Sequence, residues 1–546
     1  MLTKLARAGI SAAVLALAVT TFALAETSAT PAPNVVVSQA SPAPTASPNA
    51  FTWSGYVRAY DFYRQNAYGA LDGKNAPGSK ANQQSENNAI SLSGQYAFLN
   101  TGFSVGASYL YANPLNGCTT AAAALYPAAN SNPCYQSKSA PAVNPDTTLP
   151  QFEMSTMYQA YLQYNANGLY FKGGDQVINT PWAPSSDSRL KPVAYQGVDL
   201  SYKINPQWTI EGSDYWNWEC RTCSNFDNYT LLTDIQPGGY SYSGASAYPS
   251  TYYDPTETPL AGQTGFTYGR LGYAGPKTLP LAANVYYYGF SDIANVLWAD
   301  AKYPLNFTGR FKAFIAAQGG SEANAGTALL GTIDSQVYGV QAGFNPLANV
   351  TLTGGFDTIP WKSYTLDAAQ QAAFNSNFTC SAGAVGIAKK GKSYHGNVPY
   401  FLPTSGTGNC TTVNGSTTLY YGGWASPYTD SYATDPLFTT GGTQGMIDRR
   451  SAGASFKVAA TFTSADKQFV ATVAQEWYNY NNPAYAQATQ GTDFDTQYFF
   501  SHIPKSGPYR GLSLRVRLFS RSESDFVGGS PDGLFKYSRI QAEYDF

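Results

Sequence analysis

Long hydrophobic runs are missing from almost the whole chain. Beyond residue 25, no stretch approaches the roughly twenty apolar residues that a transmembrane helix requires, because Gly, Pro, Asn or Ser interrupts every longer run. The helix formers Met, Lys and Glu are scarce, whereas Gly and Tyr are abundant, with 51 and 43 residues, and aromatic residues make up 15% of the chain. These absences argue against a helical membrane protein and an α-rich fold. If the chain crosses a membrane, it does so with strands.

Excess charge of either sign is also missing, because the formal net charge is only -2 at pH 7. A balanced chain has no broad basic field for nucleic acid, so we expect no nucleic-acid partner. Histidine is nearly absent, and neither His395 nor His502 lies near a nucleophile-elbow pattern. We therefore expect no catalytic residue, no metal site and no cofactor.

Two short motifs could carry chemistry, but neither has the context that it needs. Residues 386–393 match the phosphate-binding P-loop pattern in full, yet no buried strand precedes them, and Gly396 and Pro399 prevent a following helix. We interpret this segment as a chance match. Cys220 and Cys223 form a C-x-x-C unit without a second ligand pair for zinc or a helix for redox chemistry, which favours a structural disulfide.

The N-terminal segment has the three parts of a secretory signal peptide. Lys4 and Arg7 precede an apolar run over residues 10–24, which closes on small residues, so the mature chain is expected to begin at Glu26. An uncleaved membrane anchor is the alternative, but the run is short for spanning. The expected domains are 1–25, the signal peptide; 26–50, a flexible periplasmic leader rich in Pro, Ala and Ser; and 51–546, a transmembrane β-barrel.

Several segments alternate apolar and polar residues, as the strands of a transmembrane barrel do. From Leu512 to Leu518 every second residue is apolar, while Arg515 and Arg517 share the opposite face and cannot face lipid. Residues 307–317 and 456–462 alternate in the same way. The cations on the polar faces of the expected strands are Arg58, Arg64, Lys172, Arg310, Lys312, Lys457, Arg515 and Arg517.

Short turns and long loops divide these expected strands. Asn-Pro sequences at 205–206 and 345–346 join alternating segments and predict tight hairpins on the periplasmic side. Long gaps at 112–150, 220–262 and 363–440 are rich in Gly, Asn, Ser and Pro. Short turns on one side and long extracellular loops on the other are typical of an outer-membrane barrel.

The end of the chain distinguishes a membrane barrel from a secreted β-sandwich or propeller, whose strands also alternate. Ile540, Ala542, Tyr544 and Phe546 form the apolar face of a last strand. This strand resembles the recognition signal of bacterial outer-membrane barrels, which end in Phe preceded by an aromatic residue two positions earlier. It predicts location in the bacterial outer membrane, with outer-membrane lipids and the barrel-assembly machinery as partners.

The six cysteines form an even set, which predicts disulfides in an exported protein. Adjacent pairing is the simplest of the possible connectivities, and all six cysteines lie in loop-like sequence. We therefore expect disulfides within loops. The expected pairs are Cys118 with Cys134, Cys220 with Cys223, and Cys380 with Cys410.

Three blocks of the sequence resemble the OprD family of substrate-specific outer-membrane porins. The most specific runs from Gly174-Asp175-Gln176 through Ser186-Asp187-Ser188-Arg189-Leu190-Lys191-Pro192 to Tyr195-Gln196-Gly197, in the order that the family shows. Weaker similarities lie at 55–64 and at 507–517. The chain departs from the family in its length, its Pro-rich leader and its cysteine-bearing loops, which leaves the substrate class open.

The resemblance implies a barrel of eighteen strands, with sixteen as the alternative, and an inward-folded loop that narrows the pore. It places Asp187 and Arg189 in that loop, and Arg58, Arg515 and Arg517 in the wall as a basic ladder for small solutes. The alternative interpretation is that these cations are solvated surface charges, or form ion pairs, and do not guide solutes. The predicted pore-lining residues are Arg58, Arg64, Lys172, Asp187, Arg189, Arg310, Lys312, Arg515, Arg517 and Glu543.

The sequence thus predicts a passive porin for small polar solutes such as amino acids, peptides or carboxylates. Two alternatives stay open: a barrel hydrolase that uses His502, and an adhesin that binds partners through its long loops. Monomer and trimer are equally compatible with the sequence.

Overall fold

The computed structural model describes most of the barrel region but not the predicted signal peptide and leader, since residues 1–50 lie outside the described residues. The described ranges are 51–66, 83–115, 153–185, 189–221, 223–226, 265–306, 312–326, 333–380, 387–389, 410–429, 434–442, 446, 452–479, 492–502, 511–523 and 533–546.

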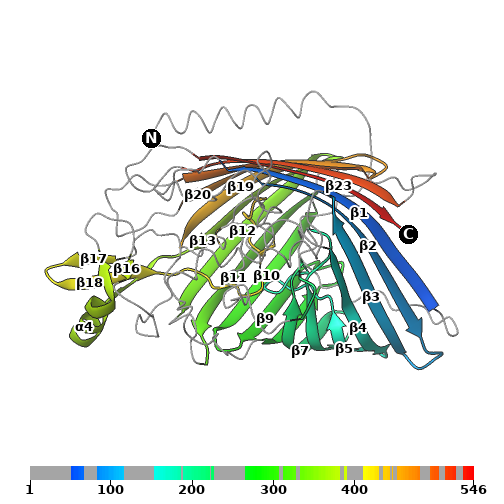
Figure 1. Cartoon of the computed structure of the whole chain (residues 1–546), viewed down its shortest axis with the longest axis horizontal. Coiled ribbons are helices and arrows are strands. Elements are labelled where there is room, and N and C mark those ends of the chain that lie inside the picture. The colour runs from blue at the N-terminus through cyan, green and yellow to red at the C-terminus, as the bar shows by residue number, and fades with distance from the viewer. Residues whose placement is uncertain are drawn as a thin grey trace.

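Eighteen antiparallel strands form one closed ring, because β1 pairs with β2 on one side and with β23 on the other. The long strands lie side by side at a tilt, with β1 in blue beside β23 in red (Figure 1). The predicted fold class and strand number are confirmed. The strands are β1 (Phe51–Asn66), β2 (Gln83–Ala97), β3 (Phe103–Pro114), β4 (Met154–Ala166), β5 (Leu169–Gln176), β6 (Ala194–Lys203), β7 (Trp208–Glu219), β8 (Phe266–Ala274), β9 (Ala282–Phe290), β10 (Ala294–Asn306), β11 (Lys312–Asn324), β12 (Asp334–Leu347), β13 (Val350–Ile359), β19 (Gly453–Thr463), β20 (Phe469–Asn479), β21 (Thr492–His502), β22 (Leu512–Glu523) and β23 (Gly533–Asp545).

The two faces of the ring differ in polarity, as the alternation predicts. On β22, Leu518 is 47% exposed on the outer face, whereas Arg539 of the neighbouring β23 is 5% exposed on the inner face. Outward apolar side chains occur on nearly every strand, and a continuous exposed apolar band of this kind fits lipid rather than water. The outward residues of the closing strand include Ile540, Tyr544 and Phe546, as expected.

Connections differ in length at the two ends of the ring. At the end where β1 begins and β23 finishes, the turns are short. Between β6 and β7, the Asn205 Oδ1 accepts hydrogen bonds from the backbone N–H groups of Gln207 and Trp208, at 2.9 and 3.0 Å. At the other end lie the long connections after β3, β7 and β13, as predicted, although β9 and β10 are joined there by a short turn.

The connection between β13 and β19 contains small elements of its own, where the sequence predicts only loop. They project from one end of the barrel (Figure 1). Within the described residues, no helix is long and apolar enough to cross a membrane. The small elements are β14 (Lys362–Thr365), α4 (Ala368–Asn377), β15 (Phe378–Cys380), β16 (Ile387–Lys389), β17 (Cys410–Val413) and β18 (Ser416–Tyr421).

Candidate functional site

The connection between β5 and β6 folds into the barrel, and its described residues, 177–185 and 189–193, are named here the first inward segment. Trp182, Arg189 and Lys191 are almost fully buried in it. The Tyr56 hydroxyl of β1 donates a hydrogen bond to the backbone carbonyl of Leu190 at 2.6 Å. The segment contains the block that carries the family resemblance, and its inward position agrees with what that resemblance implies.

Arg58 fastens the first inward segment to the seam where the barrel closes. Its guanidinium forms an ion pair with Glu543 of β23 and donates a second hydrogen bond to the backbone carbonyl of Arg189. The guanidinium also lies 4.5 Å from the centre of the Tyr56 ring. Both charged groups are largely buried, so loss of either partner would leave an uncompensated charge inside the barrel. Arg58 therefore serves mainly to connect the first inward segment to the barrel wall, and we call this connection the Arg58 tie.

Lys191 connects the same segment to the C-terminal end of β7, and we call this connection the Lys191 tie. Its Nζ donates to the backbone carbonyl of Cys220 at 2.6 Å and lies 3.4 Å from the Glu219 carboxylate. Both side chains are 0% exposed, and burial lowers the pKa of Lys191 to about 8 although Glu219 opposes this shift. Cys220 is joined to Cys223 by the predicted disulfide, which closes the turn that presents this carbonyl.

A second stretch from the β13–β19 connection also enters the barrel; its described residues, 422–429 and 434–442, are the second inward segment. Its backbone is hydrogen-bonded to wall carboxylates: the Ala425 N–H donates to Glu322 of β11 and the Thr439 N–H donates to Asp357 of β13, each at 2.7 Å. Lys457 of β19 donates to the Thr440 carbonyl at 2.7 Å.

Aromatic side chains of β6 to β10 form the wall against which both segments pack. Tyr286, Tyr288 and Phe290 stack along β9. Tyr428 of the second inward segment contacts the Phe266 ring at 4.9 Å, and its hydroxyl accepts a hydrogen bond from the Gly265 N–H. These contacts bury the middle of the lumen wall and narrow the passage.

An arginine wall lies on β1, β22 and β23 and the segments beside them. Arg189, Arg221, Arg517 and Arg539 interact electrostatically around the phenol of Tyr60. Guanidinium groups gathered in this way provide donors that match the geometry of a carboxylate. Arg189 and Arg517 are among the pore-lining residues that the sequence predicts. Arg221 is not, because its only signal is its place inside the C-x-x-C unit.

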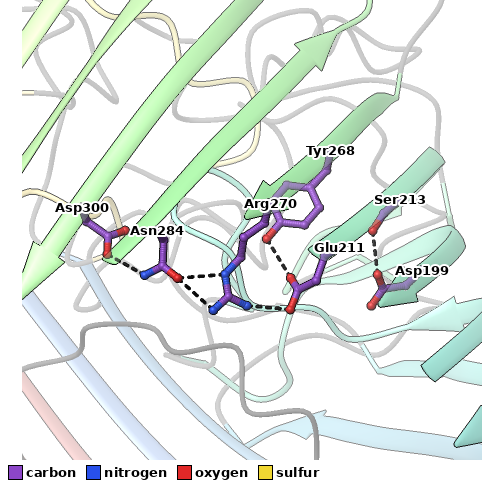
Figure 2. A network of polar contacts seen from close by, with 7 residues as sticks. All are labelled: Asp199, Glu211, Ser213, Tyr268, Arg270, Asn284 and Asp300. Atoms are coloured by element: carbon purple, nitrogen blue, oxygen red, sulfur yellow. Dashed lines mark hydrogen bonds and ion pairs between the residues drawn. The ribbon is translucent and has the colours of Figure 1, made fainter. Parts of the chain in front are cut away.

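A carboxylate wall lies on β6 to β10 and is linked from strand to strand (Figure 2). Arg270 donates to Glu211 at 2.6 Å and to the Asn284 amide oxygen, and Asn284 in turn donates to Asp300 at 2.8 Å. Beside this chain, the Ser213 hydroxyl donates to Asp199 at 2.7 Å. The amino-acid sequence gives no signal for Arg270 and Asp300, because each is an isolated charge in its strand.

The two walls face each other across the ring. In a closed ring of eighteen strands, half of the ring separates β1 from β10 and β23 from β9. The arginine wall therefore lies opposite the carboxylate wall, and a transverse field crosses the lumen between them.

The other predicted residues are scattered. Lys172 of β5 is buried in the lumen, 3.8 Å from the centre of the Tyr161 ring, and its Nζ donates to Gln159. Lys312 is exposed at the start of β11, at the end with short turns. Arg515 is half-buried on the inner face of β22. The side chain of Arg64, and Asp187, Arg310, Phe307 and Phe311, lie outside the described residues.

The remaining motifs add no chemistry. Ile387–Lys389 of the P-loop match form the short strand β16, and the other residues of that match lie outside the described residues. Cys118 and Cys134, the side chains of Cys380, Cys410 and His502, and His395 also lie outside them. Among the described residues, no group of three or more His, Cys, Asp or Glu could hold a metal.

The structure resembles several solved outer-membrane barrels at low sequence identity. OccK2 (OpdF) of Pseudomonas aeruginosa, in complex with glucuronate, is 12% identical with a TM-score of 0.55, over 91% of this chain and 98% of its own. OpdK of the same organism, with vanillate, is 12% identical with a TM-score of 0.54, over 90% and 98%.

OccAB4 of Acinetobacter baumannii is 12% identical with a TM-score of 0.57, over 92% of this chain and 99% of its own. The chain has the fold of these OprD/Occ porins. The predicted resemblance to the OprD family is thereby confirmed at the level of the fold. No protein-family model and no curated protein matches the sequence.

Proposed function

We propose that the protein is a porin of the bacterial outer membrane through which small polar solutes diffuse down their gradient. The observation that carries the proposal is a closed ring with an apolar outer face and a charged inner face, narrowed by two segments folded inside it. Passage through such a lumen involves no covalent step and no cofactor.

We infer that solutes with a carboxylate group are favoured. Glucuronate and vanillate, which occupy the two Pseudomonas neighbours, both carry a carboxylate. In this chain the arginine wall supplies guanidinium donors. Arg515 extends it along the inner face of β22 from Arg517 toward the end with short turns. Arg64, Asp187 and Arg310 keep their predicted roles as part of this proposal.

The same proposal assigns an export route. The predicted signal peptide directs the chain across the inner membrane, and β23, which ends beside Phe546, is the strand that barrel-assembly machinery would recognise. The Phe546 ring lies 5.7 Å from the Trp53 ring, and the backbones of Phe546 and Gly55 exchange hydrogen bonds of 3.0 Å. Recognition of this strand therefore involves the residues that close the barrel.

Single-channel recording in a planar bilayer tests the function. We expect stepwise current from the purified, refolded protein, with a preference for anions over cations. Absence of current from protein that migrates as a folded barrel in a gel would contradict the porin. A His502→Ala variant tests the hydrolase alternative, since it is expected to conduct as the wild type does.

A further inference from the structure

The two inward segments meet in a cluster of three indole rings. Trp182 of the first segment lies 4.9 Å from Trp424 of the second and 5.1 Å from Trp298 of β10, between ring centres. All three rings are almost completely buried. Gly320 of β11 makes room for them, because a Cβ there would lie 2.9 Å from the Trp298 ring and 3.2 Å from the Trp424 ring.

Polar atoms in and beside this cluster are buried without a protein partner. Within the described part of the chain, the Nε1–H groups of Trp182 and Trp424 and the Oε1 of Glu322 make no hydrogen bond. A buried donor or acceptor without a hydrogen-bond partner destabilises the folded state, and such groups are rare in native structures. The packed cluster is therefore stabilised by ring contact and destabilised by lost hydration.

The attachments of the second inward segment are of a kind that water can replace. No strand ladder of the barrel includes the segment, and side chains of the wall provide its hydrogen bonds. Glu322 and Asp357 accept from the N–H groups of Ala425 and Thr439, while Lys457 and Tyr478 donate to the carbonyls of Thr440 and Thr439. Carboxylates and backbone N–H groups are both readily hydrated in a water-filled lumen. Separation of the segment from the wall would also hydrate the unpaired indole N–H groups.

We propose that the second inward segment is a displaceable gate, closed in this structure by the contact between Trp182 and Trp424. This inference rests on the proposed porin function. In the open state the segment leaves the β10–β11 wall, the Trp182 and Trp424 N–H groups and Glu322 bind water, and the lumen widens. The first inward segment stays in place, because Arg58 and Lys191 tie it to two sides of the barrel.

A disulfide lock tests whether the segment moves. A Cβ built on Gly355 of β13 lies 3.1 Å from the Phe438 Cβ, slightly closer than the roughly 3.5–4.5 Å of a disulfide, so Gly355→Cys with Phe438→Cys is expected to crosslink with a small shift. We expect wild-type channels to switch between a low and a high conductance level. The oxidised double variant should lose the high level, whereas each single variant should keep it.

A substitution at the cluster tests what holds the gate closed. Trp424→Ala removes the ring contact and should shift channels toward the high level, and Trp216→Ala, on the outer face of β7, is the matched control. Folding of each variant is checked by heat-dependent migration in a gel.

The outcomes separate the two proposals. Wild-type current of a single level, or switching that survives the lock, would overturn the gate and leave the porin intact. An unchanged level distribution in Trp424→Ala would also overturn it. No current in any folded variant, including the wild type, would contradict the porin itself.

Discussion

The arginine wall and the carboxylate wall are built in different ways. Charges of the carboxylate wall come from adjacent strands and are linked across them, as between Glu211, Arg270 and Asp300. The arginine wall gathers like charges from distant parts of the chain, namely the first inward segment, the turn after β7, and the strands β22 and β23. Because its like charges are gathered without an interleaved chain of opposite charges, the arginine wall contributes the larger share of the field across the lumen.

Pairing between neighbouring strands is enough to assemble the carboxylate wall, whereas the arginine wall also requires the inward folding of loops. The first inward segment connects the two, since Arg58 binds it from β1 and Lys191 binds it to β7. Substitutions at these two ties and on each wall should therefore have distinct consequences.

Removal of the Arg58 tie is expected to have the largest effect. Arg58→Ala removes the buried ion pair of Glu543 and one hydrogen bond to the Arg189 carbonyl, so we expect a loss of about 3–5 kcal/mol in the free energy of unfolding. Urea unfolding in vesicles, followed by tryptophan fluorescence, measures it. Lys312→Ala, at an exposed position, is the control and should change stability by less than about 0.5 kcal/mol.

The Lys191 tie should make stability depend on pH. The pKa of Lys191 is about 8 in the folded protein, against an ordinary value of 10.5. Between pH 8 and 10.5 Lys191 is therefore protonated in the unfolded chain but neutral in the folded protein. Since the unfolded state binds more protons in this range, the free energy of unfolding rises with pH. The rise is about 1.4 kcal/mol per pH unit at most. Urea unfolding across pH 7.5–10.5 should show the slope in the wild type and in Lys203→Met, an exposed control, and a smaller slope in Lys191→Met. Equal slopes in all three would refute this tie.

Neutralisation on the arginine wall should weaken anion preference. At about 4 Å in water each charge interacts with a solute ion by about 1 kcal/mol, and the two charges together by about 2 kcal/mol. Arg515→Gln with Arg517→Gln should therefore lower the anion-to-cation permeability ratio by about thirtyfold. Reversal potentials in a salt gradient measure the ratio. An unchanged permeability ratio would show that the two arginines are solvated charges that do not select solutes.

Neutralisation on the carboxylate wall should change the anion-to-cation permeability ratio least. Glu211→Gln removes a charge that Arg270 already pairs with, so we expect a change of about twofold or less in the same ratio, toward anions. Glu211→Asp keeps the charge and serves as the control. A change as large as that of the arginine pair would show that the two walls are equivalent.

Alternation within single segments was enough to predict the faces of β1, β19, β22 and β23, because successive side chains of a strand point to opposite sides. It placed Arg517 inside and Leu518 outside, as the structure does. The Cys220–Cys223 pairing was also predictable, because the two residues are near neighbours. The position of the second inward segment was not, since its buried Trp424 and Tyr428 lie in sequence that reads as loop.

The barrel, its strand faces and its closing strand can be predicted from the amino-acid sequence, because they depend on a period of two and on hydrogen bonds between neighbouring strands. Which charges meet depends on the tertiary structure. Arg58 pairs with Glu543, 485 residues away, because closure of the ring brings the first and last strands together. Trp182 meets Trp424 because two loops enter one lumen, and no local pattern encodes that contact.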